Sequence, residues 1–256
     1  MHTFLVNILN NFTKISIADL DRVKLLNRTD TKFVFTHQQL LDVLPEIKDY
    51  YNILYINNSF ENNYKTLYYD TPDFIMYLNH HNGKKSRTKI RFRQYLESKL
   101  NYFEIKNKSN KGRTIKHRKP INYTQILLTE EEQEVIVATA NIKSNKLEPK
   151  IWNEFTRLTF AHKTKNERLT IDLNLRFTDY QNPERQFELK NIVIAEVKQE
   201  KLNIQSEFIQ ALKKRHIRMN GFSKYCTAVA LLFAKNVKTN NFKEKLLFVN
   251  KLMNYA

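Results

Sequence analysis

The sequence predicts a single α+β domain built on about eight β-strands. Runs of alternating apolar and polar residues, rich in Tyr and Ile, are typical of strands. Segments with apolar residues three or four positions apart, preceded by capping residues, are typical of helices. Of the 256 residues, 41% are apolar, and no internal repeat or low-complexity linker interrupts them, so the chain can form one sizeable core.

Strands and short helices are expected to alternate in the first half of the chain. Thr36 is suited to cap a helix that extends to about Lys48. The runs 51–57 and 63–70 are expected to be antiparallel neighbours. The strands expected in this half are 23–35, 51–57, 63–70, 88–95, 102–108 and 114–119.

A further helix is predicted to begin at Thr71-Pro72-Asp73, because proline is favoured in the first helical turn. This helix would end at the Asn82-Gly83 turn. The apolar residues that it would bury are Phe74, Ile75 and Leu78.

The second half of the chain contains a predicted helix between two groups of strands. Thr129 and Glu132 have the spacing of a capping box at the start of this helix, which extends to Asn141. Later strands are expected at 154–163, 168–177 and 192–200, and later helices at 204–214 and 222–234.

The chain is strongly basic, with 43 Lys and Arg against 26 Asp and Glu and a formal net charge of +17. Such an excess of positive charge indicates a polyanionic partner. The polyanions that fit are nucleic acid, an anionic membrane surface and phosphate-rich small molecules, and charge alone does not choose among them.

The few glycines and the single cysteine exclude several classes of protein. The three glycines are spaced so that no GxGxxG, GxxxxGK(S/T) or GxSxG motif occurs, which excludes Rossmann, P-loop and α/β-hydrolase folds. Cys226 alone forms neither an intrachain disulfide nor a CxxC metal site. The seven histidines include no HExxH zinc motif.

No segment of the sequence resembles a membrane span or a signal peptide. The longest apolar run, 228–234, is far shorter than the ~20 residues of a membrane-spanning helix. The amino end has no basic segment ahead of its apolar residues and no small-residue cleavage site after them. We therefore expect a cytoplasmic protein without a transmembrane segment.

Charged residues alternate with apolar ones in several of the predicted strands. Because successive side chains point to opposite faces of a strand, each charged set lies on a single face. The sets are Lys89, Arg91 and Arg93; Glu104, Lys106 and Lys108; Lys116 and Arg118; Arg168, Thr170, Asp172, Asn174 and Arg176; and Glu196, Lys198 and Glu200. The polar faces are therefore dominated by Lys and Arg, with a few acids among them.

Two arrangements of the sheet account for these polar faces. An open sheet can expose such a face to solvent. If the sheet closes into a barrel with its apolar faces against the helices, the same side chains line a tunnel whose positive field attracts a polyanion. Like charges would crowd in that tunnel, and a bound phosphate chain would relieve the crowding. The carboxylates suit a divalent cation that bridges protein and phosphate oxygens.

An ordered series of short motifs extends from Arg28 to Tyr225, over about four-fifths of the chain. In order, the motifs are Arg28-x-Asp30-x-Lys32-Phe33, Tyr68-Tyr69-Asp70-Thr71-Pro72-Asp73, Lys89-Ile90-Arg91-Phe92-Arg93-x-Tyr95, Phe103-Glu104-Ile105-Lys106-x-Lys108, Lys116-x-Arg118, Arg157, Arg168-Leu169-Thr170-Ile171-Asp172, Glu196-Val197-Lys198 and Phe222-Ser223-Lys224-Tyr225. Each motif alone is weak, but the ordered set is specific. The set resembles the VTC domain of polyphosphate polymerases, within the triphosphate tunnel metalloenzyme (CYTH-like) superfamily.

The resemblance implies a closed antiparallel β-barrel that forms a basic tunnel, with flanking and C-terminal helices. It implies that the tunnel binds ATP and transfers the terminal phosphate to a growing polyphosphate chain, with Mn²⁺ or Mg²⁺. The chain would then consist of an N-terminal arm (1–22), a tunnel domain (23–235) and a helical C-terminal tail (236–256). No specific nucleic acid is expected as a partner, and assembly with a membrane protein stays open.

The resemblance also implies roles for individual residues, by motif position. The implied phosphate and nucleotide ligands are Lys32, Arg91, Arg93, Lys106, Lys116, Arg118, Arg157, Arg168, Lys198, Ser223 and Lys224. The residues implied to act on the reacting phosphates are Arg91, Arg93, Lys106, Arg157 and Lys198. Glu196 is the implied metal carboxylate, with Asp172 and Glu104 as further candidates.

One departure separates the chain from the hydrolytic branch of that superfamily. The hydrolytic signature is Glu-x-Glu-x-Lys, and here Arg28 and Asp30 stand at the two acidic positions. On the resemblance, the leading hypothesis is a polyphosphate polymerase. The alternatives are an inorganic tripolyphosphatase of the same superfamily and a module that binds nucleic acid or another polyanion without catalysis.

Overall fold

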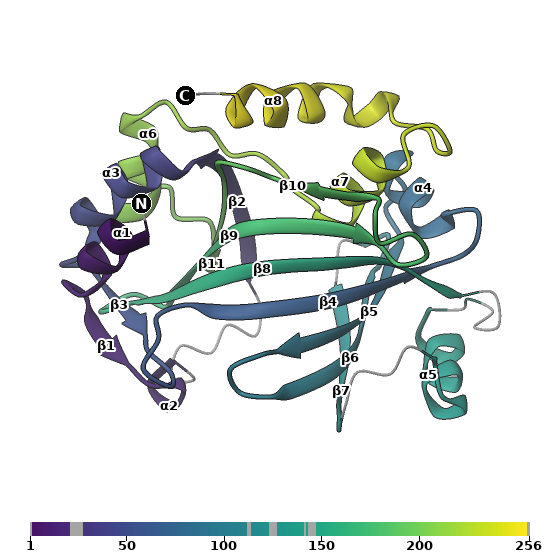
Figure 1. Ribbon diagram of the computed structural model, residues 1–256. Coiled ribbons are helices and arrows are strands. Elements are labelled where there is room, and N and C mark those ends of the chain that lie inside the picture. The colour runs from purple at the N-terminus through teal and green to yellow at the C-terminus, as the bar shows by residue number, and fades with distance from the viewer. Residues whose placement is uncertain are drawn as a thin grey trace.

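A curved sheet of eleven strands forms the centre of the described structure (Figure 1). The structure is a computed structural model that describes residues 2–20, 28–111, 114–122, 127–140, 142 and 147–254. The strands are β1 (Thr13–Ile15), β2 (Thr29–Thr36), β3 (Tyr51–Leu54), β4 (Asn62–Asp70), β5 (Arg87–Tyr95), β6 (Leu100–Lys108), β7 (Thr114–Ile121), β8 (Glu148–His162), β9 (Glu167–Asp179), β10 (Gln186–Glu188) and β11 (Ile192–Gln199). The helices are α1 (His2–Leu9), α2 (Ile17–Leu20), α3 (His37–Ile47), α4 (Ile75–His81), α5 (Glu130–Ala140), α6 (Glu207–Lys214), α7 (Lys224–Leu232), the short η2 (Asn240–Phe242) and α8 (Lys243–Met253).

The sheet is antiparallel along its main path, in the order β2-β11-β9-β8-β4-β5-β6-β7. β8 pairs with β9 along one edge and with both β3 and β4 along the other. The prediction that the strands at 51–57 and 63–70 are neighbours is therefore wrong. A strand of 15 residues is long enough to take the two shorter strands one after the other.

The predicted closure of the sheet into a barrel is not observed. Among the described residues β2 and β7 are the two ends of the path, and no pairing joins them. Both end strands carry lysines on the same face of the sheet, at Lys32 and Lys116. Repulsion between like charges on the two end strands disfavours their pairing.

The strand predictions agree with the structure for most of the chain and differ at three places. The short strands β1 and β10 were not predicted, so the described part contains eleven strands rather than about eight. β8 begins at Glu148, six residues before the predicted start. β2 begins at Thr29, and residues 23–27 of the predicted strand lie outside the described residues.

Two of the predicted helix starts are confirmed. The Thr36 side chain caps α3 by accepting from the backbone nitrogen of Gln39, and the Gln39 side chain completes a capping box. At the start of α5, the Glu132 carboxylate accepts from the backbone nitrogen of Thr129 at 2.9 Å. Both signals are local, which is why the sequence alone reveals them.

The start of α4 was predicted incorrectly. The helix begins at Ile75 rather than at Thr71, and Phe74 before it has a left-handed backbone with a φ of 58°. Its first amides are held from outside the helix, because the Asp70 carboxylate accepts from the backbone nitrogens of Met76 and Tyr77 at 2.8 and 2.9 Å. The later start turns Met76 and Tyr77 inward and leaves Ile75 exposed.

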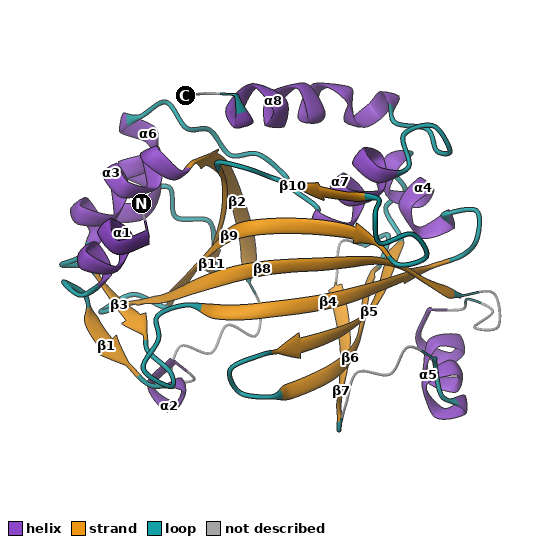
Figure 2. Ribbon diagram, in the orientation of Figure 1, coloured by secondary structure: helices purple, strands orange, loops and turns teal. Residues whose placement is uncertain are grey.

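Helices cover the two faces of the sheet differently (Figure 2). On the convex face, α1, α3 and α6 pack over a core that includes Phe33, Ile171 and Val193. On the concave face, α7 packs over one end of the sheet, where the core includes Val34 and Ile194. The charged side chains lie further along the same face of β2 and β11, where Lys32 and Glu196 are two residues from Val34 and Ile194.

Candidate functional site

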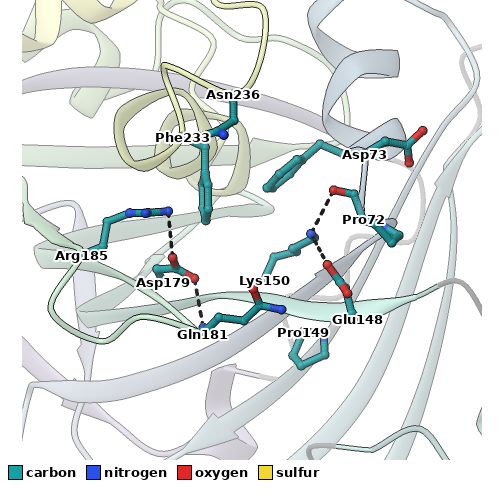
Figure 3. Close-up of a pocket in the computed structure, with 11 residues that line it drawn as sticks. Pro72, Asp73, Glu148, Pro149, Lys150, Asp179, Gln181, Arg185, Phe233 and Asn236 are labelled. Atoms are coloured by element: carbon teal, nitrogen blue, oxygen red, sulfur yellow. Dashed lines mark hydrogen bonds and ion pairs between the residues drawn. The ribbon is translucent and has the colours of Figure 1, made fainter.

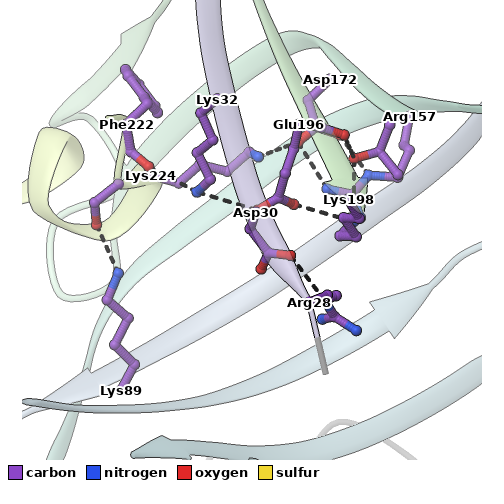
Figure 4. A network of polar contacts seen from close by, with 12 residues as sticks. Arg28, Asp30, Lys32, Lys89, Arg157, Asp172, Glu196, Lys198, Phe222 and Lys224 are labelled. Carbon is purple, nitrogen blue, oxygen red and sulfur yellow. Dashed lines mark hydrogen bonds and ion pairs between the residues drawn. The ribbon is translucent and has the colours of Figure 1, made fainter. Parts of the chain in front are cut away.

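The charged face of β2, β11, β9 and β8 forms the first of two clusters of cations. Strand register places Lys32 beside Glu196, and Arg157 beside Asp172. α7 adds Lys224 from above the sheet (Figure 4). We call this group the Glu196 cluster; its members are Lys32, Arg157, Asp172, Glu196, Lys198 and Lys224.

Glu196 lies between two lysines on the concave face. Its carboxylate oxygens are 3.2 Å from the Lys198 Nζ and 3.7 Å from the Lys32 Nζ. Burial opposes ionisation, but Lys198 and Lys32 outweigh it and hold the pKa of Glu196 well below its usual range. Glu196 is therefore an anion at neutral pH, with 19% of its side chain exposed on the concave side.

Asp172 joins the sheet to α7. Arg157 donates two hydrogen bonds to its carboxylate, from Nε at 2.6 Å and from Nη2 at 2.8 Å. Lys224 forms an ion pair with the same carboxylate. Burial lowers the pKa of Lys224 to about 8, although Asp172 raises it in part. The pair keeps Asp172 ionised and places the Lys224 ammonium over the sheet.

The loop that leads into α7 is held by two further lysines. The Lys89 Nζ donates to the Ser223 Oγ at 2.8 Å, and the Lys32 Nζ donates to the Phe222 carbonyl at 2.9 Å. Ser223 is also the N-cap of α7 and accepts from the backbone nitrogen of Cys226. The start of α7 is thus fixed against the cations of the sheet.

The second cluster lies on β5, β6 and β7 and surrounds one carboxylate. Glu104 is 1% exposed, and its oxygens lie 2.6 Å from Arg91 and 2.7 Å from Lys116. Arg118 lies at 3.4 Å and Arg93 at 4.0 Å. Burial opposes ionisation of Glu104, but Arg91 and Arg93 outweigh it and hold its pKa well below the usual range. We call these five residues the Glu104 cluster.

The curvature of the sheet brings the two clusters within electrostatic reach. Lys106 of β6 lies five strands away from β11, yet the charges of Glu196 and Lys32 act on its pKa. Burial and the nearby cations lower that pKa, while the acids raise it. Tyr64 lies between the clusters, with its ring 5.0 Å from the Arg157 guanidinium and 5.7 Å from that of Arg93.

Together the clusters place eight cations and three carboxylates on one concave surface. The crowding of like charge expected from the sequence is therefore partly offset within the protein. The surplus of positive charge remains, and Lys and Arg side chains at this spacing suit a chain of phosphates.

The structure brings almost all of the predicted ligands to this surface. Lys106 faces both clusters, and Ser223 contacts Lys89 at the edge of the surface. Arg168 lies beside Lys198 in the strand register, and its Nη2 donates to the Leu20 carbonyl at 2.6 Å. The side chains of Asp172 and Glu104 are almost fully buried among cations. Glu196, at 19%, is therefore the most exposed of the three predicted metal carboxylates.

Two residues on this surface, Lys89 and Tyr68, were not among the site residues predicted from the sequence. Lys89 has the same alternation as Arg91 and Arg93, and that pattern was sufficient to include it. The Tyr68 hydroxyl lies 3.3 Å from the Arg91 Nη1. Burial raises the pKa of Tyr68, but Arg91 and Arg93 outweigh it and lower the pKa to about 8. Nothing in the sequence marks Tyr68 as different from the neighbouring tyrosines.

A separate pocket of about 500 Å³ lies outside this surface (Figure 3). It contains the buried Lys150, which pairs with Glu148, and Arg185, which lies 3.1 Å from Asp179. Its lining includes none of the predicted phosphate ligands. Because both cations already have acidic partners, the pocket lacks the surplus of positive charge found on the concave surface.

No helix in the described part of the chain is long and apolar enough to cross a membrane. This finding agrees with the short apolar runs of the sequence.

A comparison with solved structures finds matches of low sequence identity. A proposed adenylyl cyclase from Hippeastrum with a dominant triphosphatase activity is 13% identical, with a TM-score of 0.51 over 78% of this chain and 94% of that one. A proposed adenylate cyclase from Bacillus halodurans is 13% identical, with a TM-score of 0.46 over 77% and 94% of the chains. The RNA triphosphatase of S. pombe is 12% identical, with a TM-score of 0.31 over 96% and 89%. No curated protein matches the sequence.

The curved antiparallel sheet is similar in fold to that of the Hippeastrum protein, and its concave face is cationic. The family of the chain is shown by its sequence. The family model described as the VTC domain matches residues 27–233, and the chain belongs to that family. The resemblance seen in the sequence motifs is thereby confirmed.

Proposed function

We propose that the protein elongates polyphosphate by transferring the terminal phosphate of ATP to the end of the chain. The observation that carries this proposal is the convergence of eight cations on one concave surface. Membership of the VTC domain family supports it. Such a surface neutralises several phosphates at once, which phosphoryl transfer requires.

The reaction needs no protein nucleophile. A terminal oxygen of the polyphosphate chain attacks the γ-phosphorus of ATP and forms a new P–O–P linkage. The bond from the γ-phosphorus to the β–γ bridging oxygen breaks, and ADP leaves with the electron pair. Arg91, Arg157 and Lys198 hold donor and acceptor in line and stabilise the charge on the transferred group.

The residues present fit one divalent cation of the Mn²⁺ or Mg²⁺ type. Such ions are held by one or two carboxylates together with substrate phosphates and water. Glu196 is ionised and partly exposed, and it would supply the protein oxygen. The described residues contain no group of three or more His, Cys, Asp and Glu side chains suited to a metal. The bound ion would neutralise the part of the phosphate charge that the Lys and Arg side chains do not compensate.

An inorganic tripolyphosphatase is the second candidate. The same surface would bind tripolyphosphate, and water would replace the polyphosphate end as the acceptor. The triphosphatase activity named for the Hippeastrum protein favours this candidate. The departure at Arg28 from the hydrolytic signature favours the polymerase.

The two candidates differ in the products they release. We expect the purified protein, given ATP and Mn²⁺, to release ADP in clear excess over orthophosphate, because the missing phosphate enters the polymer. Arg157→Ala, which removes the forked contact to Asp172 and a phosphate ligand, should release neither product. Equal amounts of ADP and orthophosphate, or orthophosphate from tripolyphosphate with no polymer, would establish the hydrolase instead.

A competition experiment tests the polyanion-binding module. Non-specific binding to duplex DNA weakens steeply with added salt, because it releases counterions. We expect tripolyphosphate to displace DNA at far lower phosphate concentration than its charge alone requires, because its phosphates fit between the clusters. If tripolyphosphate fails to displace DNA from the protein at physiological salt, the result would favour the binding module.

A further inference from the structure

The cationic surface ends in a group of half-buried tyrosines. Along β5 the side chains of Lys89, Arg91, Arg93 and Tyr95 share one face, so three cations are followed by an aromatic ring. On β6, Tyr102 lies opposite Arg93 in the register. The surface therefore has a cationic part and an aromatic end, with about 7 Å between successive side chains along the strand.

Arg118 lies flat against this aromatic end. Its guanidinium carbon is 3.5 Å from the centre of the Tyr102 ring. Its Nη2 donates to the Tyr95 hydroxyl at 2.9 Å, and its Nε lies 3.4 Å from the Glu104 carboxylate. The Tyr95 and Tyr102 rings meet edge to face, with centroids 5.7 Å apart. These contacts fix the plane of the guanidinium.

The way in which Arg118 is held decides what it can bind. A phosphate is recognised by the N–H groups of a guanidinium, and here Glu104 and Tyr95 already engage two of its nitrogens, Nε and Nη2. A nucleobase is recognised by the flat face of a guanidinium or an aromatic ring. One face of Arg118 rests on Tyr102, while 38% of its side chain remains exposed.

We propose that Arg118 stacked on Tyr102 forms the platform for the base of a nucleoside triphosphate. The proposal rests on the proposed function and adds the part of the site that distinguishes a nucleotide from an inorganic triphosphate. The phosphates lie on the cations of β5, and the base extends to the aromatic end of the same strands. Arg118 thus contacts the base, in place of the phosphate role implied by its motif.

The test compares two ligands that differ only in whether they carry a nucleoside. Affinities for ATP and for tripolyphosphate are measured by titration calorimetry without metal, so that turnover does not interfere. We expect Tyr102→Ala to weaken ATP binding about tenfold, since it removes one stacking layer, and to leave tripolyphosphate binding unchanged. Arg118→Ala should weaken ATP binding more than tripolyphosphate binding and serves as a second variant, although it also removes one cation from the surface.

Three controls make the result specific. Tyr102→Phe keeps the ring and should bind ATP like the parent. Tyr50→Ala removes an exposed tyrosine just before β3 and should change neither affinity. Arg91→Ala should weaken both ligands, because Arg91 lies in the cationic part of the surface.

The possible outcomes separate the platform from the proposed function. Equal loss of both ligands in Tyr102→Ala and Arg118→Ala would make these residues phosphate ligands or structural supports and would overturn the platform. Unchanged ATP affinity in both variants would overturn it as well, while the proposed function would stand. A parent protein that binds neither ligand would overturn both proposals.

Discussion

Each carboxylate of the Glu196 and Glu104 clusters is in contact with two or more cations and keeps those cations in place. Glu104 draws Arg91 and Lys116 together, and Asp172 does the same for Arg157 and Lys224. A surface of Lys and Arg alone would repel itself, so these acids stabilise the arrangement that a phosphate chain requires. Of these three carboxylates, Glu196 is the most exposed, at 19%, and it is the one that we propose binds the metal.

Glu196→Gln tests the metal role. The substitution keeps the shape of the side chain and removes its charge, so we expect turnover with Mn²⁺ to fall about 100-fold, as expected for the loss of a few kcal/mol of charge stabilisation. Tripolyphosphate affinity without metal should stay the same or increase, because one repulsive charge is gone. The measurement is the initial rate across a Mn²⁺ titration, and a parental rate at every concentration would transfer the metal role to another residue.

Arg91→Ala tests whether catalysis and stability can be separated at Glu104. Removal of Arg91 takes a cation from a buried carboxylate, so we expect loss of synthesis and a decrease of about 2 kcal/mol in the free energy of unfolding. Adding Glu104→Gln should restore most of the stability without restoring synthesis. Denaturant unfolding and product assays on the single and double variants check this, and synthesis by the double variant would show that Arg91 acts only as the partner of Glu104.

The charge of Lys224, at the start of α7, is expected to make anion binding on the concave surface depend on pH. Because the pKa of Lys224 is lowered to about 8, its positive charge is present below pH 8 and is lost as the pH increases through that value. We expect tripolyphosphate affinity to fall about tenfold between pH 6.5 and 9.5. Lys224→Met removes the titrating charge and should flatten this dependence, leaving the part due to Tyr68. An equally steep decrease in Lys224→Met, measured by calorimetry with the same ligand, would contradict the assignment.

Asp70 joins three elements, because its carboxylate caps α4 from the end of β4 and also accepts from the Tyr225 hydroxyl of α7 at 2.5 Å. We expect Asp70→Ala to lower the free energy of unfolding by about 3 kcal/mol, since several buried donors lose their acceptor. The neighbouring exposed Asp73 accepts from the Thr71 hydroxyl, and Asp73→Ala should cost less than about 1 kcal/mol. Equal midpoints for the two variants in thermal unfolding would show that Asp70 does not tie these elements together.

Elements with local signals could be predicted from the sequence, and those that depend on distant partners could not. The alternation of Arg91 and Arg93 with apolar residues located β5 correctly, and Thr36 located the start of α3. The pairing of β3 with β8 could not be read from either strand, because the partners lie about one hundred residues apart. The start of α4 was predicted at Thr71-Pro72-Asp73, whereas the helix is capped by the carboxylate of Asp70, which lies outside it. A cap from outside the helix leaves no local signal in the sequence.

At the scale of the whole molecule, the curvature of the sheet creates the site. Lys32 and Lys106 belong to strands far apart in the sheet order, and only the curvature brings their charges together. The periodicity of each strand indicated which face is charged, but it contains no information on curvature or closure. That is why the cations of the site could be named from the sequence, whereas the open sheet and the platform at Arg118 required the structure.

The central claim is that this concave surface transfers phosphate from ATP into a polymer. The most direct measurement incubates the protein with Mn²⁺ and ATP labelled at either the γ- or the α-phosphate, then resolves the products by length. We predict long, acid-labile polymer that carries label only from the γ-position, with the α-label remaining in ADP. Label from γ-ATP that appears only in orthophosphate, or not at all, would contradict the claim.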